Sequence, residues 1–272
     1  MLAGFVFTAM IILFGRSGVA NSRTLGLFSA AFVVLAFDSY LFSLISGGSF
    51  DRLRQRIWAE TMAASGLLAV GGIALISGIA WLLANYTQTE QASAHSVPAS
   101  SETGRPVDLQ TLSQRMVLGV GAGVTLLLAM TTLDYISVTL NEPAPTLIIV
   151  GAYVLPIGVV ALAAILSKVR SSRFKSDGSS IIELPLPRSL STAISSTLTY
   201  GIVGPLFAGA VTNIGDDFFN KTSWPLITLA IVIGFVIPVA LIVLLVYTVP
   251  RIVTTLRTGA AECTDEDDAP TG

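Results

Sequence analysis

Long apolar segments alternate with polar stretches along the whole chain. The seven apolar segments lie at residues 1–15, 26–47, 57–85, 117–140, 144–167, 190–213 and 225–249. A helix of about 20 apolar residues spans the hydrocarbon core of a bilayer. The pattern therefore predicts an all-α, polytopic integral membrane protein with about seven transmembrane helices.

The polar stretches divide these predicted helices into two groups. Residues 1–85 hold the first three helices and residues 117–250 hold the last four. Between the groups, residues 86–116 are rich in Ser, Thr, Ala and Gln, which predicts a flexible polar loop. Residues 251–272 form an acidic tail that we expect to be disordered.

The distribution of basic residues predicts the orientation. With the N-terminus outside, eleven Lys and Arg residues fall on the inner side and four on the outer side. This bias favours an N-out/C-in arrangement with a cytoplasmic C-terminal tail, although the cluster Arg52–Arg56 opposes it. Segment 1–15 has no basic residue before it and Arg16 after it, so we expect it to be retained rather than cleaved as a signal peptide. The short chain, its few lysines and its lack of targeting signals favour the plasma membrane of a prokaryote.

Composition agrees with a membrane location and narrows the function. Hydrophobic residues make up 53% of the chain and charged residues 12%, whereas a soluble domain carries roughly 25% charged residues. The net charge of −2 does not indicate nucleic-acid binding. Cys263 and His95 are the only residues of their types, which argues against a disulfide, a zinc site and a histidine-based triad. Segment 225–249 has no lysine that could hold retinal. We therefore expect no enzymatic activity, cofactor or metal, and we expect the partners to be the lipid bilayer and either a second copy or another membrane subunit.

Asp38 is the most unusual residue of the predicted membrane-embedded part. It lies near the middle of segment 26–47, where an aspartate costs about 2.5–3.5 kcal/mol on insertion scales. The eleven Leu, Ile, Val and Phe residues of that segment return about 0.3–0.6 kcal/mol each. The apolar residues therefore offset the cost of Asp38, and segment 26–47 can insert into the membrane. With no basic residue inside any segment, we expect Asp38 to be protonated at rest or hydrogen-bonded to hydroxyl groups.

Two further acids, Glu60 and Asp134, fall in the same predicted half of the membrane as Asp38. Glu60 lies at the outer end of its segment, and Asp134 lies about two turns from the outer end of segment 117–140 with Thr131 and Ser137 on the same face. Ordered by depth, the three acids suggest an ion or proton pathway that leads inward to Asp38. The alternative is that each acid separately holds helices together or meets the interface.

Glycines and prolines predict how the helices pack and bend. Gly119 and Gly123 form a GxxxG pair, which favours close helix packing over phosphate binding because no strand precedes the glycines and no Lys-Ser/Thr pair follows them. Pro156, Pro205 and Pro238 each fall inside one of the last three segments. Each proline removes a backbone donor and can kink its helix.

Two classes of function stay open at this stage. The preferred interpretation is a non-enzymatic accessory or assembly component of the plasma membrane, packing through its glycine-rich faces. The alternative is a channel or transporter for protons or a small cation that uses Asp38, Asp134 and Glu60.

Overall fold

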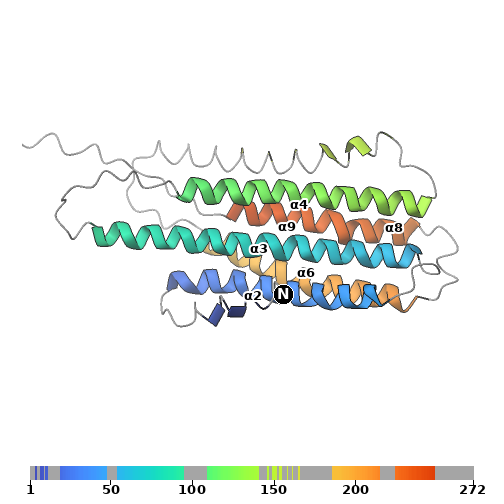
Figure 1. Cartoon of the computed structure of the whole chain (residues 1–272), viewed down its shortest axis with the longest axis horizontal. Coiled ribbons are helices and arrows are strands. Elements are labelled where there is room, and N and C mark those ends of the chain that lie inside the picture. Colours follow the sequence, from blue (N-terminus) through green and yellow to red (C-terminus); the bar gives the residue numbers. More distant parts are fainter. Residues whose placement is uncertain are drawn as a thin grey trace, which may run out of the picture.

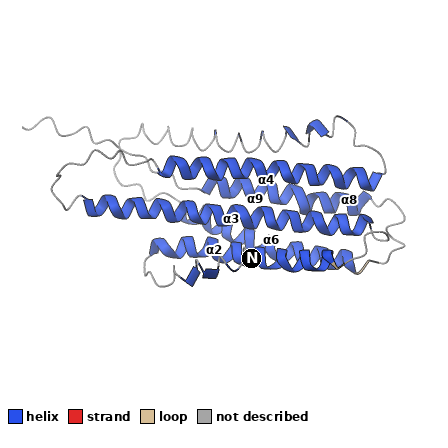
Figure 2. Cartoon of the chain, viewed as in Figure 1, coloured by secondary structure: helices blue, strands red, loops and turns tan. Residues whose placement is uncertain are grey.

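All the regular elements of the chain that are described are helical. The computed structural model describes residues 19–47, 54–94, 109–140, 186–214 and 224–248, together with isolated positions in 4–11 and 146–165. The helices, shown in Figures 1 and 2, are α2 (Val19–Ser46), α3 (Arg54–Ala94), α4 (Leu109–Leu140), α6 (Leu186–Thr212), α8 (Trp224–Ile231), the π-helix η1 (Val232–Val236) and α9 (Ile237–Thr248).

Five stretches of these described helices are long and apolar enough to cross a membrane. They are Thr24–Ser46, Arg56–Leu83, Arg115–Leu140, Ser189–Thr212 and Trp224–Thr248. Each matches a predicted segment to within about two residues at either end, which confirms the helical class and five of the predicted positions. The predicted segments 1–15 and 144–167 lie mostly outside the described residues. The number seven and the N-out/C-in orientation therefore stay predictions.

Helices α3 and α4 extend well beyond their apolar segments. Helix α3 continues to Ala94 and α4 begins at Leu109, so much of the stretch predicted as a flexible loop is helical; residues 95–108 lie outside the description. The prediction was wrong there because hydropathy marks what enters the lipid and says little about where a helix ends. Residues such as Gln, Glu and Ala favour helix in water as well.

Helix α3 occupies the centre of the bundle. It contacts α2, α4, α6, α8, η1 and α9, and it runs through the middle of the view in Figure 1. The colours of Figure 1 show that α2, α4 and α6 run in one direction while α3 and the α8–η1–α9 helix run in the other. Two contacts fix the register of the parallel pair α2 and α6: a Cβ on Gly26 would lie 3.0 Å from Ile194, and one on Gly201 would lie 2.9 Å from Val34.

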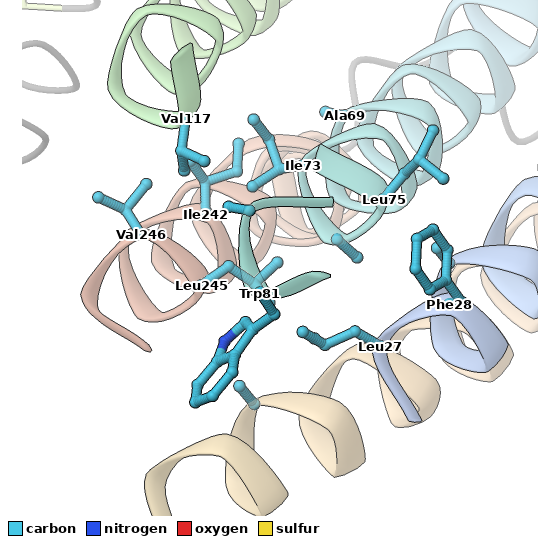
Figure 3. Close-up of a cluster of buried hydrophobic side chains, with 14 of the residues drawn as sticks. Leu27, Phe28, Ala69, Ile73, Leu75, Trp81, Val117, Ile242, Leu245 and Val246 are labelled. Atoms are coloured by element: carbon cyan, nitrogen blue, oxygen red, sulfur yellow. The ribbon is translucent and has the colours of Figure 1, made fainter. Parts of the chain in front are cut away.

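The core divides into two apolar clusters at successive levels of the bundle. The first, drawn in Figure 3, includes Leu27, Phe28, Ile73, Trp81 and Ile242. The second includes Val34, Leu41, Met62, Leu67, Tyr135, Tyr200, Phe207 and Ile233. The buried acids Asp38 and Glu60 lie on α2 and α3 within the sequence range of the second cluster.

Candidate functional site

Asp38 is buried inside the bundle. Its side chain belongs to α2 and only 4% of the residue is exposed. Its Oδ1 atom has no hydrogen-bond partner among the described residues. Ser39, the neighbouring hydroxyl, donates instead to the Leu35 carbonyl of its own helix. The carboxyl group lies within electrostatic range of the phenol of Tyr200 on α6.

Tyr200 joins α6 to the π-helix. It is 2% exposed, and its hydroxyl donates a hydrogen bond of 3.0 Å to the backbone carbonyl of Ile233. A carbonyl in the middle of a helix normally accepts an N–H of its own helix. The tyrosine therefore satisfies an acceptor that the helix itself has left open.

Pro238 explains why the Ile233 carbonyl is open. In η1 the N–H of Ile237 bonds to the carbonyl of Val232, five residues earlier, so it does not serve Ile233. If this five-residue spacing continued, the N–H of residue 238 would donate to the Ile233 carbonyl. Residue 238 is a proline and has no N–H. In a membrane an unsatisfied carbonyl costs several kcal/mol. The Tyr200 hydroxyl supplies the missing donor from another helix.

Gly66 on α3 provides the space for this junction. A Cβ at this position would overlap the Tyr200 hydroxyl and would lie 2.9 Å from Cγ of Pro238 and 3.2 Å from the carbonyl oxygen of Gly234. Gly234 is equally confined, because a Cβ there would lie 2.9 Å from Cβ of Met62. Only glycine at these two positions lets α3 approach the π-helix this closely.

Glu60 is part of a separate polar group at one end of α3. Its Oε1 accepts a hydrogen bond of 2.9 Å from Nε of Arg56, one turn earlier, which makes an ion pair. The Thr212 hydroxyl on α6 lies 2.9 Å from the same Oε1 and 2.9 Å from the Ala208 carbonyl. Its single proton serves one acceptor at a time, and the carboxylate is the stronger of the two. Glu60 therefore links α3 to α6 and gives Arg56 a partner.

Asp134 lies apart from both groups. Asp134 stands on α4 and is exposed in the described bundle. The Thr131 hydroxyl donates to the Leu127 carbonyl and the Ser137 hydroxyl donates to the backbone carbonyl of Asp134, so neither serves the carboxylate. The three predicted acids thus occupy three different environments: buried beside Tyr200, paired with Arg56, and exposed on α4.

The GxxxG pair also lies on an open face. A Cβ at Gly119 or Gly123 would meet no described atom within 4 Å. The glycine between them, Gly121, faces α9 instead, where a Cβ would lie 3.4 Å from Val246 and 3.6 Å from Ile242. The role of Gly119 and Gly123 in helix packing stays a prediction.

Sequence reasoning found Asp38 and Pro238 but missed their surroundings. Arg56 was detectable, since it stands four residues before Glu60 on a predicted helix. Tyr200 carried no signal, because a tyrosine in an apolar helix is unremarkable until its partner is known. Within the described part of the chain, no group of three or more His, Cys, Asp or Glu residues is arranged to hold a metal ion.

The length and apolar composition of the described helices indicate a helical membrane protein. No protein-family model, curated protein or solved structure matches the chain. The function is therefore argued from the geometry of the site.

Proposed function

We propose that this protein moves protons or another small cation across its membrane, with Asp38 as the group that carries the charge. The observation that supports this most is the Oδ1 atom of Asp38, which is buried without a hydrogen-bond partner among the described residues. An ionisable side chain at this depth is costly, and such residues mark ion and proton pathways.

The immediate surroundings of Asp38 favour transport over simple helix cohesion. An aspartate that served only to hold helices together would have its oxygens hydrogen-bonded across the interface. Asp38 instead lies within electrostatic range of Tyr200, which in turn bonds to a π-turn just before Pro238 in a continuous helix. π-turns are frequent at functional sites.

The chemistry required of Asp38 is a cycle of charge gain and loss. A carboxylate accepts one proton, or binds one cation, from one side of the membrane and releases it to the other. Glu60 lies on the far side of Asp38 from the first apolar cluster. Counting from the contact of Gly71 with Leu35 between antiparallel α3 and α2, Glu60 is about 12 Å beyond Asp38 at 1.5 Å per residue. Glu60 is ion-paired with Arg56, so it forms a polar group on this side of Asp38.

A second candidate function is an accessory or assembly role through the outer face of α4. Asp134 is exposed on this face, and Gly119 and Gly123 are open on the same stripe. Met116 and Leu127 beside them are 50% and 63% exposed. An aspartate facing lipid would cost about 2.5–3.5 kcal/mol, so this face is suited to contact another helix. On this proposal Asp134→Asn and Gly123→Leu weaken association in detergent.

The transport proposal is tested by flux into proteoliposomes that contain the purified protein. Proton entry is followed with an internal pH dye, and sodium and potassium entry with ion-selective dyes. We expect flux with the wild type, loss of flux with Asp38→Asn, and retention of flux with Asp134→Asn, which removes an exposed acid. Equal flux for wild type and Asp38→Asn would overturn the assignment of Asp38, and no flux with any variant would leave the accessory role.

A further inference from the structure

Pro205 opens a second backbone carbonyl in the bundle, on α6. The proline stands inside this helix. Because proline has no N–H, it cannot donate to the carbonyl four residues earlier, which belongs to Gly201. The open carbonyl of Ile233 receives its hydrogen bond from another helix, through the Tyr200 hydroxyl. An open carbonyl is costly inside a membrane, so a donor from another helix is expected for Gly201 as well.

One close contact places Asp38 beside this turn of α6. A Cβ on Gly201 would lie 2.9 Å from Cγ2 and 3.7 Å from Cα of Val34, so the backbones of α2 and α6 approach closely there. Asp38 follows Val34 by one turn, and Pro205 follows Gly201 by one turn. Because α2 and α6 run in the same direction (Figure 1), Asp38 lies at the level of the turn from Gly201 to Pro205. Side chains tilt toward the N-terminus of their helix and carbonyls point toward the C-terminus, so the Asp38 carboxyl group and the Gly201 carbonyl converge.

Two more contacts close the space around Asp38, which is 4% exposed. A Cβ on Gly71 of α3 would lie 2.8 Å from Cγ of Leu35 on α2. One on Gly204 of α6 would lie 3.1 Å from Cδ2 of Leu67 on α3. Helices α2, α3 and α6 therefore touch one another in pairs around this level. Such close packing leaves little room for a hydrated ion, which favours a partner for Oδ1 within the chain itself.

We propose that Asp38 and the backbone carbonyl of Gly201 together form the binding site of the transported proton. The proton is bonded to Oδ1 of Asp38 and shared with the Gly201 oxygen in an O–H···O=C hydrogen bond. A carboxylate and a carbonyl are both acceptors only, which agrees with a buried Oδ1 that has no partner among the described residues. One added proton turns Oδ1 into a donor and neutralises the carboxylate in the same step. The inference rests on the proposed function and names its cargo as the proton.

This hydrogen bond exists only while the proton is bound. When the proton leaves to a water molecule, the carboxylate regains its negative charge and faces a carbonyl oxygen that repels it. The loaded site therefore holds α2 against α6, whereas the empty site favours their separation. A contact that served only helix cohesion would not depend on the proton in this way.

The groups around Asp38 favour a proton over sodium or potassium. A metal cation needs several oxygen ligands around one point, whereas Asp38 and Gly201 supply oxygens from two residues between tightly packed helices. The titratable groups on the neighbouring helices are engaged elsewhere. The Tyr200 hydroxyl donates to η1, and Glu60 pairs with Arg56. The acid on α4 is exposed.

A double-mutant cycle tests the pair. Asp38→Leu keeps a side chain of similar size and removes the donor to Gly201, whereas Pro205→Ala supplies an N–H that can serve this carbonyl. We expect the effect of Asp38→Leu on the folding equilibrium constant to be about tenfold smaller in the Pro205→Ala background. Pro238→Ala is the matched control, because the carbonyl that it relieves already has the Tyr200 hydroxyl. Its effect should add to that of Asp38→Leu without coupling. Unfolding in detergent measures all the variants.

The cycle and the flux assay fail in different ways. Additive effects of Asp38→Leu and Pro205→Ala, together with flux that is lost in Asp38→Asn, would overturn the pair and leave the proposed function standing. Coupling in the cycle without cation flux in the wild type would overturn the proposed function and the cargo, and would leave the pair as a structural contact.

Infrared spectroscopy of the protein in liposomes detects the proton itself. A carboxylic acid has a C=O stretching band that is separate from the amide bands. We expect a band that is present in the wild type and absent in Asp38→Asn. In Pro205→Ala it should move to higher frequency, because the carboxylic acid loses its acceptor. The absence of an Asp38-dependent band, or its removal by sodium at constant pH, would overturn the assignment of the proton to this site.

Discussion

Gly66 has no Cβ, and this allows α3 to pack directly against Tyr200 of α6 and against the π-helix. Its Cα faces the Tyr200 hydroxyl, the Pro238 ring and the Gly234 carbonyl at distances that leave no space for a side chain. All three groups are held by packed helices, so none moves away cheaply. The glycine therefore serves close packing between α3 and the π-helix.

Gly66→Ala is expected to destabilise the protein by about 1–3 kcal/mol, the usual cost of overpacking a tight interior. Gly72→Ala, on the same helix, is the matched control because a Cβ there would meet no described atom within 4 Å. Alanine is the better helix former, so the control should be neutral or slightly stabilising. Unfolding in detergent by heat or denaturant measures both. Equal losses in the two variants would contradict the packing account.

Tyr200 contributes through its hydroxyl as well as through its buried ring. Tyr200→Phe keeps the ring and removes the donor to Ile233, so it is expected to cost about 1–3 kcal/mol of unfolding free energy. Tyr40→Phe is the control, since Tyr40 is 60% exposed on α2. The same unfolding experiment compares the two, and a Tyr200→Phe variant as stable as the control would show that the Ile233 carbonyl needs no partner.

At the level of the elements, sequence patterns predicted helices well and their interruptions poorly. The apolar segments located five candidate spans because a run of about twenty apolar residues matches the thickness of the bilayer core, where a helix satisfies its own backbone groups. Pro238 signalled a disturbance in the last helix. It could not reveal a π-turn, because that geometry depends on a donor from Tyr200, 38 residues earlier on another helix. Asp38 was found from its rarity, whereas its partners depend on tertiary packing.

A double-mutant cycle tests the link between Pro238 and Tyr200. Pro238→Ala restores an N–H that can serve the Ile233 carbonyl, so the Tyr200 hydroxyl becomes less necessary. The loss caused by Tyr200→Phe should then be smaller in the Pro238→Ala background, with a coupling energy of about 0.5–3 kcal/mol. Unfolding free energies of the wild type, both single variants and the double variant give this energy. Additive effects would mean that the proline does not create the need for the tyrosine.

At the scale of the whole molecule, the described helices run in two opposing directions, α2, α4 and α6 one way and α3 and the α8–η1–α9 helix the other. Their orientation relative to the membrane is a prediction from the charge bias.

Cys263, the only cysteine of the chain, is a natural probe of orientation. With an N-out/C-in arrangement, a membrane-impermeant maleimide should label it only after the cells are permeabilised. In a Cys263→Ser background, a cysteine introduced by Gly47→Cys, directly after the C-terminal end of α2, should react with the maleimide in intact cells. Labelling of Cys263 in intact cells would reverse the predicted orientation.

The most direct test of the account compares two replacements of Asp38 in the same proteoliposome assay of proton flux. Asp38→Asn preserves the shape and removes the titratable group, whereas Asp38→Glu preserves the group and lengthens the side chain. If Asp38 carries the proton, Asp38→Asn has no flux above empty liposomes and Asp38→Glu keeps a measurable part of the wild-type rate. Wild-type flux in Asp38→Asn would contradict the account.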